Sequence, residues 1–237
     1  MPADHVLEIL ARLSVDAEPE HVATRLCELC AEATGMSGAA IMMMSHERAQ
    51  VSIGTTNSVS ELIEELQFTL GEGPCVDAYE QRIPVLEPDL AEPATARWTA
   101  FSPAAVDAGV RAVFGFPLSV GDLSLGALNL YRDRPGALTA SQHADALLLA
   151  SVAARAIIAI EVDAPPGSFN TELQAGTNFR FVVHQAAGMI SVQLGISVAD
   201  ALARLRAHAF AVNRSILDLA GDVVERRLRF TDGDAAP

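Results

Sequence analysis

Residues 110–131 read VRAVFGFPLSVGDLSLGALNLY. Two runs in this stretch, Val110–Pro117 and Leu123–Tyr131, have the apolar and β-favouring composition of strands. Gly121-Asp122 between them is a turn signal. Strands joined this tightly pair antiparallel, because parallel neighbours need a long crossover. The stretch therefore predicts an antiparallel sheet.

Helical segments and further strands surround this pair. Thr139 and Gln142 have capping-box spacing at the start of an alanine- and leucine-rich helix that ends near Val162. Helices mixed with an antiparallel sheet define an α+β domain. The other elements expected in it are helices over 1–15, 18–34, 59–66 and 101–108, and strands over 39–44, 50–54 and 82–86.

A second, helical segment follows a linker. The run Ala164-Pro-Pro-Gly-Ser168 cannot continue a helix, and polar residues follow it. Ser197 and Ser215 then have the character of N-caps, each with an aspartate three residues on. The sequence predicts a domain over 1–163, a linker over 164–177, a three-helix bundle over 178–230 and a tail over 231–237.

The charge is distributed unevenly between these two domains. Half of the residues are hydrophobic and only 19% are charged, which excludes a disordered chain. The formal net charge is −14, but residues 1–177 hold 9 arginines against 24 acids and residues 178–230 hold 7 arginines against 4 acids. An evenly acidic chain would repel nucleic acid. Because the second domain is basic, the net negative charge of the chain does not exclude nucleic-acid binding.

Cysteine use and hydropathy predict a cytoplasmic protein without a membrane span. Three cysteines cannot form a paired framework, and no secretory segment opens the chain. The weakly polar run 144–162 is interrupted by Asp145, Arg155 and Glu161. No nucleophile–base pair and no phosphate-cradling glycine loop is evident, so we expect neither an enzyme nor a cofactor.

The cysteines and methionines carry weaker functional signals. Cys27-x-x-Cys30 lacks a second ligand pair, so two small buried side chains are favoured over a metal site. Cys75 follows a Gly-Glu-Gly-Pro turn and is a candidate sensor thiol. The Met42–Met44 run suits a strand with alternate members buried, or an adaptable pocket.

The first helix of the second domain is apolar on two sides. One stripe contains Val183, Ala186 and Ile190, and a second line contains Phe181, Gly188 and Val192. A helix with two apolar faces usually has two neighbours. We expect the second line to meet a partner subunit or the first domain.

The second domain resembles the ANTAR family of bacterial antitermination regulators over residues 179–227. The resemblance rests on His184-Gln-Ala-Ala-Gly-Met-Ile, Gly195-Ile-Ser, Asp200-Ala-Leu, Leu205-Arg-Ala-His-Ala, Asn213-Arg and Leu219-Ala. It implies a dimer that binds paired RNA hairpins in nascent transcripts. The sequence departs from the family at Ala187, where a lysine is usual.

The first domain resembles the GAF family of small-molecule sensors over roughly 20–160. The resemblance implies a sensor pocket on the sheet and a possible small-molecule effector. The matching segments are Leu70-Gly-Glu-Gly-Pro-Cys, Ile83-Pro-Val-Leu, Pro88-Asp-Leu, Arg97-Trp98, Gly109–Pro117 and Leu125-Gly-Ala-Leu-Asn-Leu-Tyr131.

Two sets of candidate site residues follow. Arginine forks suit phosphate and stack on unpaired bases. The candidate RNA contacts are Arg180, Gln185, Arg204, Arg206, His208, Asn213 and Arg214. In the sheet, alternation puts either Phe114 and Phe116 or Val113 and Gly115 on a given face. The candidate sensor-pocket residues are Met42, Met44, Cys75, Trp98, Phe101, Phe114, Phe116, Asn129 and Tyr131.

The pair of resemblances predicts a signal-responsive antitermination regulator, dimeric and RNA-binding. Three-helix units with a positive charge also bind duplex DNA, so a DNA-binding regulator with the same sensor is an alternative. A ligand-binding or redox protein whose tail only dimerises is another.

Overall fold

The computed structural model describes residues 22–44, 50–93, 96–163, 170–212 and 214–231. The chain forms two compact units, which divide at Thr171 and Glu172. Each is described here by itself. The predicted helix over 1–15 and the start of the one over 18–34 lie outside the described residues.

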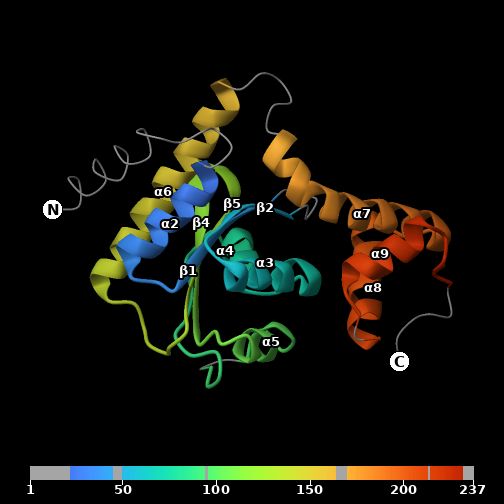
Figure 1. Ribbon diagram of the computed structural model, residues 1–237, viewed down its shortest axis with the longest axis horizontal. Helices are drawn as coiled ribbons and strands as arrows, with labels where there is room; N and C mark the ends of the chain where they lie inside the picture. The colour runs from blue at the N-terminus through green and yellow to red at the C-terminus, as the bar shows by residue number, and fades with distance from the viewer. Residues whose placement is uncertain (1–21, 45–49, 94–95, 164–169, 213, 232–237) are drawn as a thin grey trace. The chain divides into compact units, whose positions relative to one another are not determined.

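The first unit is built on a five-stranded antiparallel sheet, in agreement with the predicted α+β fold (Figure 1). The strands β4 (Ala112–Val120) and β5 (Leu123–Arg132) are joined by a turn at Gly121 and Asp122, as expected. The strand predicted over 82–86 spans only Val85–Glu87, because Arg82 adopts a left-handed conformation that ends the preceding helix. In sheet order the strands are β2 (Gln50–Thr55), β1 (Gly38–Met44), β5 (Leu123–Arg132), β4 (Ala112–Val120) and β3 (Val85–Glu87).

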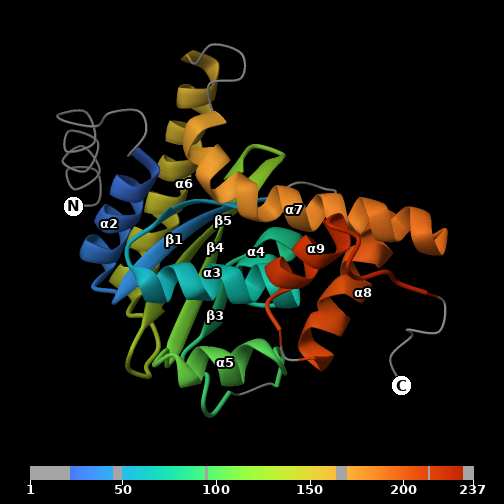
Figure 2. The ribbon, with the colours of Figure 1, turned by 45° about the vertical axis from the view of Figure 1, so that its right-hand side comes forward.

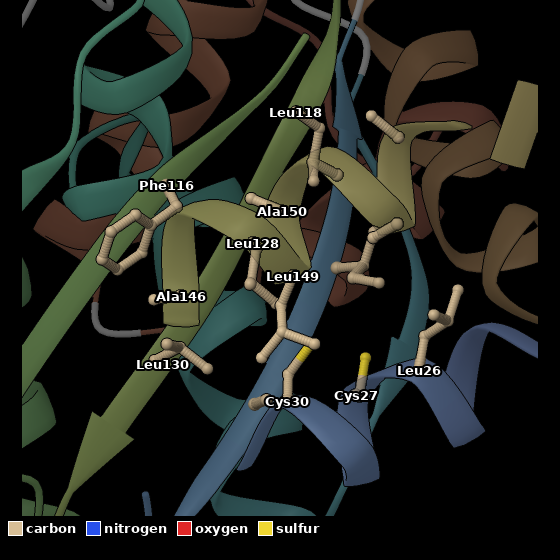
Figure 3. Close-up of a cluster of buried hydrophobic side chains, with 14 of the residues drawn as sticks. Leu26, Cys27, Cys30, Phe116, Leu118, Leu128, Leu130, Ala146, Leu149 and Ala150 are labelled. Atoms are coloured by element: carbon tan, nitrogen blue, oxygen red, sulfur yellow. The ribbon is translucent and has the colours of Figure 1, made fainter. Parts of the chain in front are cut away.

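Helices α2 (Val22–Thr34) and α6 (Ala140–Asp163) cover one face of this sheet (Figure 1). The expected capping box forms, since the Gln142 amide donates to Thr139 Oγ1 and the Thr139 amide donates to Gln142 Oε1. Gln142 Nε2 also donates to the Thr34 carbonyl at 2.8 Å, which ties the start of α6 to the end of α2. Figure 3 shows the side chains that these helices bury against β4 and β5.

Helices α3 (Ser58–Leu70), α4 (Pro74–Gln81) and α5 (Phe101–Asp107) lie on the opposite face (Figure 1 and Figure 2). Asn57 caps α3 by accepting from the Ser60 amide, and left-handed Gly71 ends it. The helix ends four residues beyond the predicted 59–66, because it continues up to Gly71 at the start of the Gly-Glu-Gly-Pro break.

The second unit consists of α7 (Asn170–Leu194), α8 (Val198–Ala211) and α9 (Ile216–Val224). Ser197 and Ser215 cap α8 and α9 as predicted. The division between the units lies within the expected linker over 164–177, and α7 begins there at Asn170, eight residues before the expected start of the bundle at 178. The run Glu172-Leu-Gln-Ala175 consists of good helix formers, whose propensity outweighs its polarity.

Within the described residues, Ala140–Ala159 of α6 is long and apolar enough to cross a membrane. One third of that window is buried inside the protein, where it packs on the sheet. The apolar parts of α7 and α8 pass the same test only as one span bent by 106°. Length and composition alone therefore give weak support to a membrane role.

Candidate functional sites

The face of the sheet beneath α3, α4 and α5 gathers most of the candidate sensor residues. It packs as one buried cluster, and side chains alternate along β1 and β5 so that every second residue points to it. Asn129 shares this face with its neighbours two residues away on β5, and it is 1% exposed. The candidates that meet here are Met42, Met44, Cys75, Trp98, Phe101, Asn129 and Tyr131.

Phe114 and Phe116 are the exceptions and require a correction. Both belong to the buried cluster on the other face, beneath α2 and α6 (Figure 3). The Arg132 guanidinium lies 5.3 Å from the Phe114 ring centre, and the His143 ring lies 5.7 Å from that of Phe116. The sequence left open which of the two alternating sets on β4 faces the candidate sensor residues. In the structure Val113 and Gly115 point toward the face covered by α3, α4 and α5 (the sensor face).

A buried polar cluster lies on the sensor face. The Glu64 carboxylate accepts from Asn129 Nδ2 at 3.4 Å and from Gln67 Nε2 at 3.5 Å. Gln67 Oε1 accepts the Cys75 amide at 2.7 Å. Glu64, Gln67 and Asn129 are each at most 2% exposed, and Asn129 Oδ1 accepts no hydrogen bond from the described residues. A buried acceptor without a donor is costly, so this atom favours a ligand or water that donates.

Small residues flank Asn129 in the sheet. Its neighbours across β1 and β4 are Ala40 and Gly115. A Cβ atom at Gly115 would lie 2.3 Å from the Pro74 carbonyl oxygen, so the N-terminal end of α4 rests directly on β4. The glycine thus lets α4 approach the sheet beside the polar cluster.

The segment that carries Trp98 and Phe101 is held onto the unit by two carboxylates. Trp98 Nε1 donates to Asp77 Oδ2 at 3.1 Å, and Glu72 Oε1 accepts the Ala100 and Phe101 amides at 2.8 Å each. The Arg97 guanidinium lies 4.7 Å from the Trp98 ring centre. These contacts fix α5 against α4 and the preceding turn.

The three thiols are buried and protonated at neutral pH. Burial raises the pKa of Cys75 well above its ordinary value, and the nearby Glu64 carboxylate raises it further. Burial also raises the pKa of Cys27 and raises that of Cys30 to about 12. Cys27 Sγ donates to the Gly54 carbonyl at 3.3 Å. Since thiolates are the reactive form, this placement disfavours a redox role in the folded unit.

A metal site was not expected, and the described residues contain no group of three or more histidine, cysteine, aspartate or glutamate side chains able to hold an ion. Cys27 and Cys30 point from α2 into the core (Figure 3).

Glu64 and Gln67 are not among the sensor-pocket residues predicted from the sequence. They lie at i and i+3 on α3, within a buried stripe that also contains Ser60, Ile63 and Phe68. Polar residues inside an apolar helical stripe are the signal that could have identified them.

In the second unit, the described candidate RNA contacts lie in different surroundings. Arg204 and Arg206 lie two residues apart on α8, which separates them by about 200° around the helix. Both are half-buried, Gln185 is exposed, and His208 packs at 5.3 Å on the Phe230 ring. Asn213 lies outside the described residues, as does the side chain of Arg180.

Arg214 is exposed and forms an ion pair. Its Nη2 donates to Asp222 Oδ2 at 2.8 Å, while Arg227 Nε donates to Asp222 Oδ1 at 2.7 Å. Arg227 also pairs with Glu225. These hydrogen bonds lower the pKa of Asp222, most strongly through Arg227. The second unit therefore presents two guanidinium groups held on one carboxylate.

The two predicted apolar sides of α7 differ in the structure. Val183, Ala186 and Ile190 are buried, as expected, and Ala187 is also fully buried. On the second line Val192 is 85% exposed. The position where the ANTAR family usually carries a lysine is thus an interior position here.

Comparison with known proteins supports the GAF-like fold of the first unit. A family model described as the GAF domain matches residues 16–158. The GAF domain of an Acinetobacter phosphoenolpyruvate-protein phosphotransferase superposes with a TM-score of 0.53 at 12% identity, covering 68% of this chain and 96% of that one. The equivalent domain from Coxiella burnetii gives 0.52 at 16% identity, covering 68% and 95%. At such identities the likeness shows the fold alone. No curated protein matches the chain.

Proposed function

The chain belongs to the GAF domain family, and from this premise we propose that it is a signal-responsive antitermination regulator that binds hairpin RNA through its second unit. In this proposal the first unit is the sensor and α7–α9 form an ANTAR-like output. The protein acts as a cytoplasmic homodimer without catalytic activity.

The observation that carries the proposal is the agreement between the resemblance over 179–227 and the positions of three helices. The breaks between α7, α8 and α9 fall at Gly195-Ile-Ser and at Asn213-Arg, where two of the ANTAR-like motifs lie. The basic balance of residues 178–230 supports contact with a polyanion. A sensor domain placed before such a unit fits a regulator.

The sensor would respond to a small molecule on the face covered by α3, α4 and α5. Among the described residues no group donates to Asn129 Oδ1 there, and the Glu64 carboxylate adjoins this amide. A ligand that offers N–H or O–H donors would satisfy this amide oxygen. Its binding would bias the packing of the units or of two subunits, which is how we expect a signal to reach the RNA-binding unit.

The proposal is tested by crosslinking the full chain to cellular RNA and sequencing the recovered fragments. We expect enrichment of transcripts with two neighbouring hairpins over an uncrosslinked sample. Competition between the most enriched RNA and duplex DNA of the same sequence, at one salt concentration, separates RNA binding from DNA binding. Failure to enrich any RNA, or preference for the duplex DNA, would refute the proposal.

A further inference from the structure

We propose that Arg214 and Arg227, held together by Asp222, form the phosphate-binding centre of the second unit, and that Arg226 and Arg229 extend it. This inference rests on the proposed function, because it identifies the RNA-contacting residues of that unit. It keeps Arg214 from the set expected from the sequence, but it replaces the expected contacts on α7 and α8 with arginines that follow α9.

The two guanidinium groups come from opposite ends of α9. Arg214 lies just before its N-cap and Arg227 lies beyond its last residue, yet both donate to the carboxylate of Asp222. Each oxygen of that carboxylate takes one arginine. The acid therefore fixes the spacing of two forks that would otherwise repel each other.

The two arginine side chains are more exposed to solvent than the aspartate that holds them. The Arg214 and Arg227 side chains are 47% and 58% exposed, whereas that of Asp222 is 17% exposed. The carboxylate thus lies beneath the guanidinium groups. Arg214 donates to it through Nη2, while Arg227 is held by Asp222 through Nε and Nη2 and by Glu225 through Nη1, so Arg214 has more donors left for a phosphate than Arg227. Arginine forks bind phosphate oxygens in pairs, so this surface suits a phosphodiester group.

The turn after α9 keeps the other arginines close to this pair. The Asp222 carbonyl accepts the Arg227 and Leu228 amides at 2.7 and 3.0 Å, and Arg226 has a positive φ of 62°. Further along, the Phe230 amide donates to Gln193 Oε1 at 2.9 Å and the buried Phe230 ring packs on His208. Arginines on such an anchored turn lose less conformational entropy on binding than those on a free tail.

The local charge favours a polyanion. Arg214, Arg226, Arg227 and Arg229 are exposed, against the acids Asp222 and Glu225 that pair with them and the exposed Asp218 in the first turn of α9. The excess stays positive after these pairs are counted. By contrast, Arg204 and Arg206 on α8 are half-buried and lie on different sides of the helix.

The test is a salt titration of RNA affinity with full-length variants. The probe is a labelled synthetic copy of the most enriched crosslinked RNA. We expect Arg214→Ala and Arg227→Ala each to weaken binding and each to reduce the log–log salt slope by about one, and the double variant by about two. Arg229→Ala leaves both Asp222 pairs intact and should also reduce the slope, which keeps the test informative if the double variant folds poorly.

The matched control is Arg25→Ala. The Arg25 side chain is 41% exposed and is likewise paired with an acid, Glu28, at 2.7 Å, but it lies on α2 of the sensor unit. Its replacement should leave affinity and slope unchanged. The inference is wrong, while the proposed function stands, if the wild-type protein binds the RNA and Arg214→Ala, Arg227→Ala and Arg229→Ala all keep its salt slope and its affinity within twofold. If wild-type protein binds no RNA, both fail.

Discussion

Replacement of Gly115 by alanine tests how closely α4 rests on the sheet. The new methyl carbon would lie 2.3 Å from the Pro74 carbonyl oxygen and 3.2 Å from the Ala78 Cβ atom. Ordinary contact begins near ~3.4 Å, so the start of α4 must retreat by about 1 Å. Overpacking of this kind costs about 1–3 kcal/mol. We expect the free energy of unfolding of the sensor unit to fall by about 2 kcal/mol.

The assay uses the fluorescence of Trp98, the only tryptophan in the chain. Its indole donates to Asp77 on α4, so a displaced α4 should also change the emission of the folded protein. With a urea slope of about 2 kcal/mol per M, the unfolding midpoint should fall by about 1 M.

A double variant separates the two contacts at this position. Ala78→Gly removes the side chain near the new methyl group but leaves the Pro74 backbone oxygen in place. Gly115→Ala combined with Ala78→Gly should therefore remain at least as unstable as Gly115→Ala alone. Full recovery in the double variant, or a Gly115→Ala midpoint equal to that of the wild type, would refute the backbone contact.

Four further outcomes are expected. Asn57→Ala removes the cap of α3 and the acceptor of the Tyr131 hydroxyl, and should cost about 1–2 kcal/mol in urea unfolding, while Asn57→Asp keeps the acceptor and much of the stability. The buried thiols should resist a thiol reagent at pH 8 in the folded protein and react once urea unfolds it; immediate labelling of Cys30, whose pKa burial raises to about 12, would contradict the structure. Ala187→Lys should destabilise the second unit by about 1–3 kcal/mol in thermal unfolding followed by circular dichroism, because the side chain enters a buried position, whereas exposed Gln185→Lys should not. The lowered pKa of Asp222 means that its stabilising pairs are intact at neutral pH and are lost as acid protonates it, so the difference in thermal stability between wild type and Asp222→Asn should shrink as the pH falls through the acidic range.

Much of the fold of each unit could be predicted from local sequence patterns. The β4–β5 hairpin, the capping box of Thr139 and Gln142 and the serine caps of α8 and α9 depend on residues close in the chain, and all are present. Such signals act within a few residues, so the sequence displays them directly.

The site was harder to predict because it depends on long-range geometry. Alternation along β4 allowed either face for Phe114, and only the packing of α2 and α6 decides between them. Glu64 meets Asn129 across 65 residues of chain. In the second unit, Asp222 joins arginines from both ends of α9, which no local pattern indicates.

The hydrogen bond from Gln142 to the Thr34 carbonyl has a consequence for synthesis. It joins segments 108 residues apart, and β1 likewise pairs with β5 only after some 80 further residues have been made. Until then the β1–β2 hairpin has an open edge, and such long-range closures slow folding. On the ribosome, the sensor can close only when α6 has emerged, which happens before the second unit has emerged in its turn. The order of synthesis therefore completes the domain that would receive the signal ahead of the one that would act on it.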